Sequence, residues 1–281
     1  MPDDSNGTFD LDGDLTVNRL GFGAMRLTGE GVMGPPDDEE EAKNVLRRAR
    51  NLGIDFIDTA DSYGPGVSER LIAETFGPDY EDVTIATKGG LWRTLAGDWP
   101  TCGEPEYLQN TLMGSLDRLG VDSIDLYQYH RPDPDTPFAD SVGQLAEFKD
   151  EGYVDHVGIS NVSVEQLDEA RDIVEIATVQ NRYNVGDRDS EAVLEACGEY
   201  GIGFIPWFPL GSGDLGDRGE IVAEIADAHD ASEQQVALAW LLGRSEVTLP
   251  IPGTSSVSHL EDNVAAAEID LSDDEMARLT D

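Results

Sequence analysis

Lysine is almost absent from this chain. The 18 basic residues include only three lysines, Lys43, Lys88 and Lys149, whereas 58 residues are acidic and the net charge is −40. A nucleic-acid groove needs clustered cations that replace the counterions of phosphates, and an anionic membrane surface attracts the same positive sign. The composition therefore argues against both partners.

The acidic residues are nevertheless interspersed with regular apolar segments, and hydrophobic residues make up 39% of the chain. A disordered acidic chain lacks such segments, so we interpret the charge as the coating of a folded body. Because the Debye length falls to about 3 Å in molar salt, this coating suits a high-salt cytosol. We expect a protein of a salt-loving microbe, and an ordinary acidic mesophilic protein is the alternative.

Cysteines and long apolar runs are also scarce. Cys102 and Cys197 are too few for a disulfide framework or a cysteine-rich metal cluster, so we expect two free thiols. The sequence has no apolar run of 18 residues and does not open on the basic and apolar pattern of a secretory leader. We therefore expect a soluble, cytoplasmic protein.

An Asp12-Gly13 pair lies between two short apolar segments, 9–11 and 15–17. Asp-Gly accommodates the positive φ of a tight turn, so the chain is predicted to open with a β-hairpin. The alternating aspartates around this turn also suggest a calcium loop, but Leu15 stands where such a loop needs glycine. We expect no calcium there.

Short apolar runs then alternate with segments of helical spacing. The predicted strands are 20–23, 54–57, 83–87, 124–129, 154–159, 178–180, 201–205 and 247–251, and the predicted helices are 39–52, 106–119, 138–151, 164–173, 190–200, 221–228 and 234–242. Strict alternation indicates a parallel sheet that is covered on both faces. Eight such units match a (β/α)₈ barrel with an N-terminal β-hairpin, and without a linker the chain, 1–281, is predicted to be one domain.

A doubly wound dinucleotide-binding fold is the alternative. It usually has fewer strands and a glycine-rich first turn. The nearest candidate here, residues 21–26, reads Gly-Phe-Gly-Ala-Met-Arg and lacks the third glycine. The sequence therefore favours the barrel.

Polar residues end three of the predicted strands. Asp58, Lys88 and His130 follow the second, third and fourth apolar runs, and Tyr63 lies in the loop after Asp58. Active sites of such barrels lie at the carboxyl ends of the strands, where neighbouring strands are about 4.8 Å apart. We expect these four side chains to meet at one mouth.

A buried ammonium at Lys88 requires a counter-ion, which Asp58 supplies. A positive charge beside Tyr63 favours the phenolate, so we expect a lowered tyrosine pKa and a general acid. His130 can then orient a substrate carbonyl. The alternatives are an interior ion pair, a tyrosine at the rim and a strand-end histidine without a chemical role.

In combination, these four residues resemble the catalytic tetrad of the aldo-keto reductases. The resemblance covers nearly the whole chain and includes four segments, at 53–64, 158–161, 207–212 and 251–263. It implies that Trp207 stacks on a nicotinamide ring, that Ser160, Asn161 and Gln180 hold its carboxamide, and that the last segment holds the adenosine phosphate. The implied cofactor-binding residues are Gly23, Ala24, Met25, Ser160, Asn161, Gln180, Trp207, Phe208, Pro209, Leu210, Gly211, Ser212, Asp214, Thr254, Ser255, Ser256, His259, Asp262 and Asn263.

The resemblance further implies a monomeric, NADP(H)-dependent enzyme that reduces an aldehyde or ketone, with NAD(H) as the less favoured cofactor. Many relatives have lysine at Gly253 and arginine at His259, which grip the 2′-phosphate. In this sequence, His259 and the hydroxyls at 254–256 are the groups expected to bind the 2′-phosphate. Segments 17–27, 34–36 and 251–256 resemble the pyridoxal reductase branch of the family.

Two other classes of protein are alternatives to an aldo-keto reductase enzyme. A cofactor-binding regulatory subunit with little turnover shares the fold, but the complete tetrad argues against it. A metal-dependent barrel needs several histidines and carboxylates that converge at strand ends, and only His130 of the four histidines ends a strand.

The substrate wall is expected from loop 91–102, where Trp92 and Trp99 indicate an aromatic pocket or, alternatively, local packing. With few cations in the chain, backbone amides at 210–214 and 254–256 are expected to meet the cofactor phosphates. Salt should then strengthen cofactor binding, because it screens the repulsion between two anions.

Overall fold

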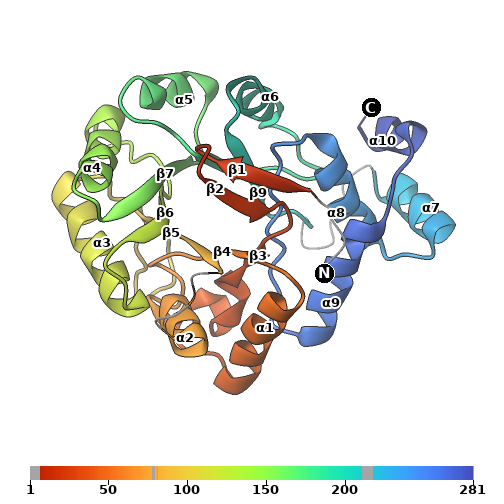
Figure 1. The fold of residues 1–281 in the computed structure, drawn as a ribbon, viewed down its shortest axis with the longest axis horizontal. Coiled ribbons are helices and arrows are strands. Elements are labelled where there is room, and N and C mark those ends of the chain that lie inside the picture. Colours follow the sequence, from red (N-terminus) through yellow and green to blue (C-terminus); the bar gives the residue numbers. More distant parts are fainter. Residues whose placement is uncertain (1–6, 78–79, 81, 211–217, 281) are drawn as a thin grey trace.

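The structure is a computed structural model that describes residues 7–77, 80, 82–210 and 218–280. A ring of helices surrounds a parallel sheet, and a small two-stranded sheet lies across one end of it (Figure 1). The strands are β1 (Thr8–Leu11), β2 (Leu15–Asn18), β3 (Phe22–Gly23), β4 (Phe56–Asp58), β5 (Thr84–Gly89), β6 (Ile124–Tyr129), β7 (Val154–Ser160), β8 (Thr178–Arg182) and β9 (Gly203–Trp207). The helices are α1 (Glu39–Asn51), α2 (Val67–Phe76), α3 (Pro105–Leu119), α4 (Phe138–Asp150), α5 (Val164–Arg171), α6 (Glu191–Tyr200), α7 (Gly219–His229), α8 (Glu233–Arg244), α9 (Val257–Ala265) and α10 (Asp273–Thr280).

Strands β3 to β9 form one parallel sheet in chain order. The predicted eighth strand is reduced to a bridge between Thr248 and Phe204 of β9. Its carbonyls still accept hydrogen bonds from the other edge, because the amides of Gly21 and Gly23 donate to residues 250 and 252. This segment therefore closes the ring, and the predicted (β/α)₈ barrel is confirmed.

Two prolines explain why the eighth strand is so short. Pro250 and Pro252 have no N–H group, so they accept from β3 without donating to a ladder. The sequence pattern identified the strand by its apolar side chains but did not account for the missing donors.

The predicted N-terminal hairpin is also confirmed. Strands β1 and β2 pair antiparallel, and Asp12 and Gly13 at the turn both have positive φ. Leu11 and Val17 are fully buried and pack with Phe56, Leu126 and other apolar side chains inside the barrel. The hairpin thus closes the amino-terminal end of the barrel.

The helices follow the expected pattern, with three additions. Helix α1 shows the local logic, since the Asp38 side chain accepts from the Glu41 amide and acidic residues precede basic ones along the helix. Helices α2, α9 and α10 were not predicted. Helix α2 follows Gly66, which is left-handed and offers no side-chain cap, so the usual start signal is missing.

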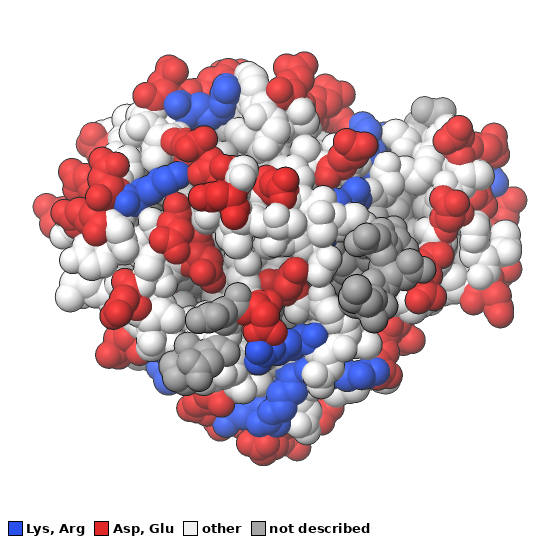
Figure 2. All heavy atoms as spheres, in the orientation of Figure 1, with Lys and Arg blue, Asp and Glu red and all other residues white. Residues whose placement is uncertain are grey.

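Acidic side chains spread over the face that surrounds the hairpin (Figure 2). Cys102 and Cys197 are free thiols, as expected. Among the described residues, no helix is long and apolar enough to cross a lipid bilayer.

Candidate active site

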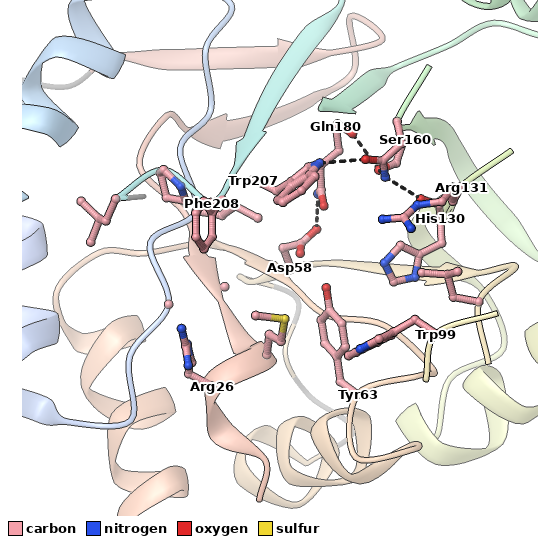
Figure 3. Close-up of a pocket in the computed structure, with 18 residues that line it drawn as sticks. Arg26, Asp58, Tyr63, Trp99, His130, Arg131, Ser160, Gln180, Trp207 and Phe208 are labelled. Carbon is pink, nitrogen blue, oxygen red and sulfur yellow. Dashed lines mark hydrogen bonds between the residues drawn. The ribbon is translucent and has the colours of Figure 1, made fainter. Parts of the chain in front are cut away.

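A cavity of about 450 Å³ opens at the carboxyl ends of the strands (Figure 3). Side chains alternate along a strand, so every second residue points into a barrel. In β5 and β6 the inward series runs from apolar Ala86 and Leu126 to Lys88 and Gln128 one step later. The cavity therefore lies directly above an apolar layer, on a polar layer made by the next inward residues.

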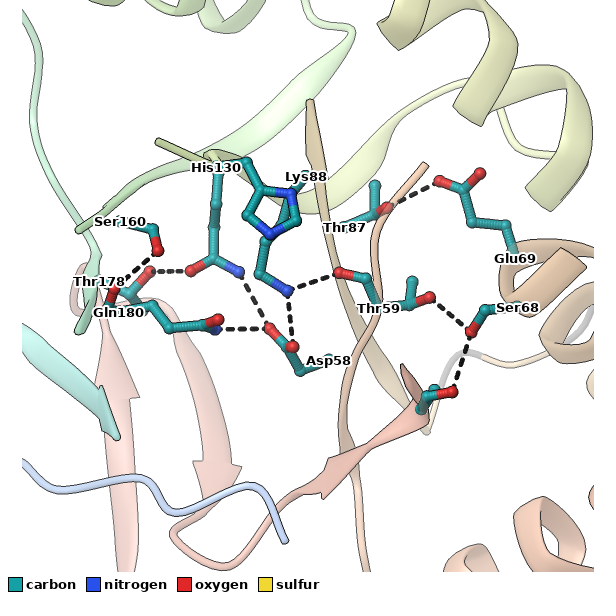
Figure 4. Close-up of polar contacts among 12 residues, drawn as sticks. Asp58, Thr59, Ser68, Glu69, Thr87, Lys88, His130, Ser160, Thr178 and Gln180 are labelled. Carbon is teal, nitrogen blue, oxygen red and sulfur yellow. Dashed lines mark hydrogen bonds and ion pairs between the residues drawn. The ribbon is translucent and has the colours of Figure 1, made fainter. Parts of the chain in front are cut away.

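The centre of the polar layer is a buried ion pair (Figure 4). Lys88 Nζ donates to Asp58 Oδ1 at 2.6 Å and to the Thr59 carbonyl at 2.7 Å, and both charged side chains are almost fully buried. Burial lowers the pKa of Lys88, and the attraction of Asp58 opposes that effect. The predicted counter-ion relation between Lys88 and Asp58 is thus present.

Two glutamines complete the shell of Asp58. Gln180 Nε2 donates to Asp58 Oδ2 at 2.7 Å, and Gln128 Nε2 donates to the same oxygen at 3.2 Å. Thr178 Oγ1 donates to Gln128 Oε1 at 3.5 Å and so orients the amide. A Cβ on Gly158 would lie 2.4 Å from Thr178 Oγ1 and 2.8 Å from Gln128 Cγ, so only glycine leaves room for this pair.

Tyr63 lies over this layer, with Lys88 Nζ 5.3 Å from its ring centroid. The pKa of Tyr63 is raised well above its usual value, first by burial and then by Asp58 and Asp61. The sequence-based expectation of a lowered pKa is wrong for this arrangement, because burial and the two nearby carboxylates outweigh the Lys88 charge. A phenol that stays protonated at neutral pH is what a proton donor requires.

His130 faces Tyr63, with ring centroids 6.0 Å apart and an interplanar angle of 81°. Burial lowers its pKa well below the usual value, and the charges of Lys88 and Arg131 lower it further. Nδ1 is buried and has no hydrogen-bond partner among the described residues. The imidazole is therefore neutral at physiological pH, and Nε2 remains to contact a ligand.

A chain of hydrogen bonds forms the opposite wall. Trp207 Nε1 donates to Asn161 Oδ1 at 3.1 Å, and Asn161 Nδ2 donates to the His130 carbonyl at 3.0 Å. Ser160 Oγ donates to the Gln180 carbonyl at 2.7 Å. Asn161 and Phe208 both have positive φ, which is uncommon for non-glycine residues and clusters at functional sites.

Gly23 and Gly253 also line the cavity, and their backbones lie close together. A Cβ on Gly23 would lie 2.7 Å from the Ile251 carbonyl oxygen, and a Cβ on Gly253 would lie 2.6 Å from that of Gly23. The two backbones approach so closely that neither position accepts a side chain.

The structure brings most of the predicted residues to this cavity. Those that line it are Gly23, Met25, Asp58, Tyr63, His130, Ser160, Asn161, Gln180, Trp207, Phe208, Pro209 and Leu210. Lys88 lies beneath it at 0% exposure. Gly211, Ser212 and Asp214 fall outside the described residues.

Several predicted residues do not line the cavity. Ala24 is fully buried behind it in a 3₁₀ helix, Ala24–Leu27. Thr254, Ser255, Ser256, His259, Asp262 and Asn263 continue from the lining residue Gly253 into α9. Thr254 Oγ1 accepts from the Ser256 amide at 3.1 Å, so one of the expected hydroxyls already serves the start of this helix.

Sequence reasoning missed two arginines on the cavity wall, Arg26 and Arg131. The expectation of a site with little cation is therefore wrong. Their isolated positions in the sequence gave no signal beyond their rarity in an acidic chain. Of the two tryptophans, Trp99 lines the cavity edge-on to Tyr63, whereas Trp92 lines a neighbouring hollow beside α3.

No cluster of three or more histidine, cysteine or acidic residues placed to hold a metal occurs in the described part of the chain.

Residues 19–281 match the model of the aldo/keto reductase family. The chain belongs to this family. As an aldo/keto reductase, it contains the tetrad-like group Asp58, Tyr63, Lys88 and His130 in one connected arrangement.

Two relatives are similar to this aldo/keto reductase over nearly its whole length. It is 49% identical over 267 residues to an uncharacterized oxidoreductase of Schizosaccharomyces pombe, covering 95% of this chain and 87% of that protein. It is 43% identical over 282 residues to pyridoxine 4-dehydrogenase of Escherichia coli, covering 98% of each chain.

Solved structures of aldo-keto reductases are similar over nearly their full length. A thermostable aldo-keto reductase in complex with the inhibitor epalrestat has a TM-score of 0.87 at 32% identity, with 97% of this chain and 98% of that chain covered. An aldo-keto reductase of Klebsiella pneumoniae in complex with NADPH has a TM-score of 0.82 at 25% identity, with 97% and 93% covered.

Proposed function

We propose that this aldo/keto reductase uses NADPH to reduce an aldehyde or ketone to an alcohol, with Tyr63 as the proton donor. The observation that carries the proposal is the geometry around Tyr63. A buried, protonated phenol lies between a neutral imidazole and a buried ammonium, at the bottom of an open cavity. A carbonyl oxygen placed there would meet a proton donor and a second hydrogen-bond donor or polariser.

The lining residues fit a nicotinamide cofactor. Gly23 and Gly253 line the cavity without side chains, and the partly buried ring of Trp207 offers a flat face held by Asn161. Gln180 and Ser160 supply amide and hydroxyl groups to a carboxamide, and Arg26 supplies a cation for phosphates. When bound, the reduced cofactor supplies the hydride.

The chain's own residues then handle the proton and the charge. Tyr63 donates its hydroxyl proton to the oxygen that gains negative charge, and the Lys88 ammonium stabilises the phenolate that remains. Asp58, held by three donors, keeps Lys88 in place. His130 orients the carbonyl through Nε2.

The preferred cofactor and the candidate substrate are proposed from helix α9 and from the relatives. We propose a moderate preference for NADPH over NADH, because His259 in the first turn of α9 and the start of that helix favour a phosphate. The preference is moderate because an imidazole lacks the forked donors of a guanidinium and cannot form a bidentate pair with a phosphate. The similarity to pyridoxine 4-dehydrogenase supports pyridoxal among the candidate substrates.

The test measures NADPH oxidation with a panel of aldehydes that includes pyridoxal, for the wild type and for Tyr63→Phe. General-acid loss typically costs about 10²-fold or more in kcat, and the variant should still bind NADPH. Tyr153→Phe is the control, because Tyr153 is exposed and precedes β7 at the other end of the barrel. Cofactor binding without turnover by the wild type would instead indicate a regulatory subunit, and equal turnover by Tyr63→Phe would remove Tyr63 from the mechanism.

The cofactor proposal is tested by kcat/KM with NADPH and NADH. Replacement of His259 by alanine should lower kcat/KM for NADPH and leave that for NADH nearly unchanged. A wild-type preference for NADH would contradict the proposal.

A further inference from the structure

Arg131 is an exposed cation on the wall of the cavity, immediately after His130. Within the described part of the chain, its side chain forms no ion pair and no hydrogen bond. Figure 3 shows its guanidinium beside the His130 ring, on the side of the cavity that holds Tyr63 and Trp99. Arg26, the other cavity arginine, lies on the opposite side, near Phe208.

Most cations in the described part of the chain have a carboxylate partner, and Arg131 is among those that do not. All three lysines and eight of the arginines form ion pairs with carboxylates. The acidic residues outnumber the basic ones by 58 to 18, so an arginine on the surface has many potential partners. Arg131 is thus kept apart from them at the mouth of the site.

The nearest carboxylate in the sequence shows how this separation is achieved. Asp133 accepts from the amides of Gly103 and Asp135 at 2.8 and 3.1 Å, and from the hydroxyls of Thr101 and Thr136 at 3.2 and 3.1 Å. These bonds fix Asp133 to the loop that follows β5. Its charge is therefore satisfied locally, and Arg131 remains available to a ligand.

The surroundings of Arg131 define what the ligand should look like. Trp99 and Tyr63 meet edge to face, with ring centroids 6.3 Å apart, and Leu91 is buried next to them. Together they form an apolar wall that suits a flat ligand body. A guanidinium binds a carboxylate by two parallel hydrogen bonds, which gives both attraction and orientation.

We propose that Arg131 determines substrate specificity and selects flat aldehydes that carry a carboxylate. This inference rests on the proposed carbonyl reduction and names the substrate class of the same site. The net charge of −40 repels an anionic substrate, so a local cation at the mouth offsets that repulsion where the substrate binds. Arg131 is a binding residue in this scheme, and Tyr63 remains the proton donor.

The experiment compares two aldehydes of equal size at one fixed salt concentration. Para-carboxybenzaldehyde carries the anion, and para-formylbenzamide replaces it with a neutral amide. In Arg131→Gln, kcat/KM for the carboxylate substrate should fall about tenfold relative to the amide substrate, chiefly through KM, because an ion-paired hydrogen bond is lost. Arg131→Lys should retain part of the preference, because the charge remains but the planar pair of donors is lost.

Arg26→Gln is the matched control, since it removes a cation from the same cavity on the opposite side. It should weaken NADPH binding, as its proposed contact with the phosphates requires, but it should affect both aldehydes alike and so leave the ratio of their kcat/KM values unchanged. If the ratio is equally unchanged in Arg131→Gln, or if that variant instead weakens NADPH binding, Arg131 does not select the substrate and the inference is overturned. The proposed carbonyl reduction fails separately, if the wild type oxidises NADPH with neither aldehyde.

Discussion

The buried pair of Lys88 and Asp58 allows a quantitative test of the site's architecture. Lys88→Met removes an ammonium at 0% exposure and leaves the Asp58 carboxylate buried. Breaking such a pair costs about 3–5 kcal/mol, because the remaining charge has lost its partner. Since Asp58 keeps the amide donors of Gln180 and Gln128, we expect the lower end, about 3 kcal/mol.

The assay is urea unfolding at constant KCl, followed by tryptophan fluorescence, together with the melting temperature. With an unfolding entropy of about 2.1 cal/mol/K per residue, a loss of about 3 kcal/mol lowers Tm by about 5 °C in a chain of this length. Lys149→Met is the matched control. Lys149 pairs with Asp12 at 2.8 Å but is 27% exposed, so its removal should cost about 1 kcal/mol or less.

A double variant decides whether the loss comes from the stranded charge. Asp58→Asn combined with Lys88→Met removes both charges and keeps an oxygen for the two glutamines. It should be more stable than Lys88→Met alone. Equal losses for Lys88→Met and Lys149→Met, or a double variant that is still less stable, would refute the reasoning.

Three further predictions follow from the same structure. Gln128→Leu deletes a donor to Asp58 and should lower kcat more than it raises KM for the carbonyl substrate; a change in KM alone would contradict a positioning role for Gln128. The pH profile of reductive kcat/KM should stay flat from about pH 7 to about pH 9, because the pKa of His130 lies well below its usual 6.5 and that of Tyr63 well above 10; a fall in this range with a single midpoint would argue against these assignments. The melting temperature should rise steeply between about 0.1 M and about 2 M KCl, because salt screens the charge of −40; a flat curve would contradict the inferred high-salt origin.

Much of the site could be predicted because its residues end apolar strands. Asp58, Lys88 and His130 stand at the ends of β4, β5 and β6, where a barrel places its chemistry, and chain order alone assigns them to neighbouring strands. Tyr63 could be added only in their company, since a tyrosine in a loop has no pattern of its own.

Other features depend on three-dimensional neighbours and were out of reach. In the sequence, Gln128 is only a polar residue within an apolar strand. Its role follows from the hydrogen bonds of its amide to Asp58 and Thr178, which only the structure shows. The direction of the Tyr63 pKa depends on how deeply the ring is buried, which no spacing reveals. The same holds for Arg131, whose availability depends on the bonds that occupy Asp133.

The hairpin that covers the amino-terminal end of the barrel also offers a point for attaching this protein to a surface. Leu11 and Val17 close that end, whereas the cavity opens at the carboxyl ends of the strands. Small molecules therefore enter at one end of the barrel, and a surface can be attached at the other. Thr16 is exposed on β2, Cys197 is buried and Cys102 is only partly exposed. A thiol introduced at Thr16 would therefore anchor the protein to a support or an electrode with its mouth turned toward the solution.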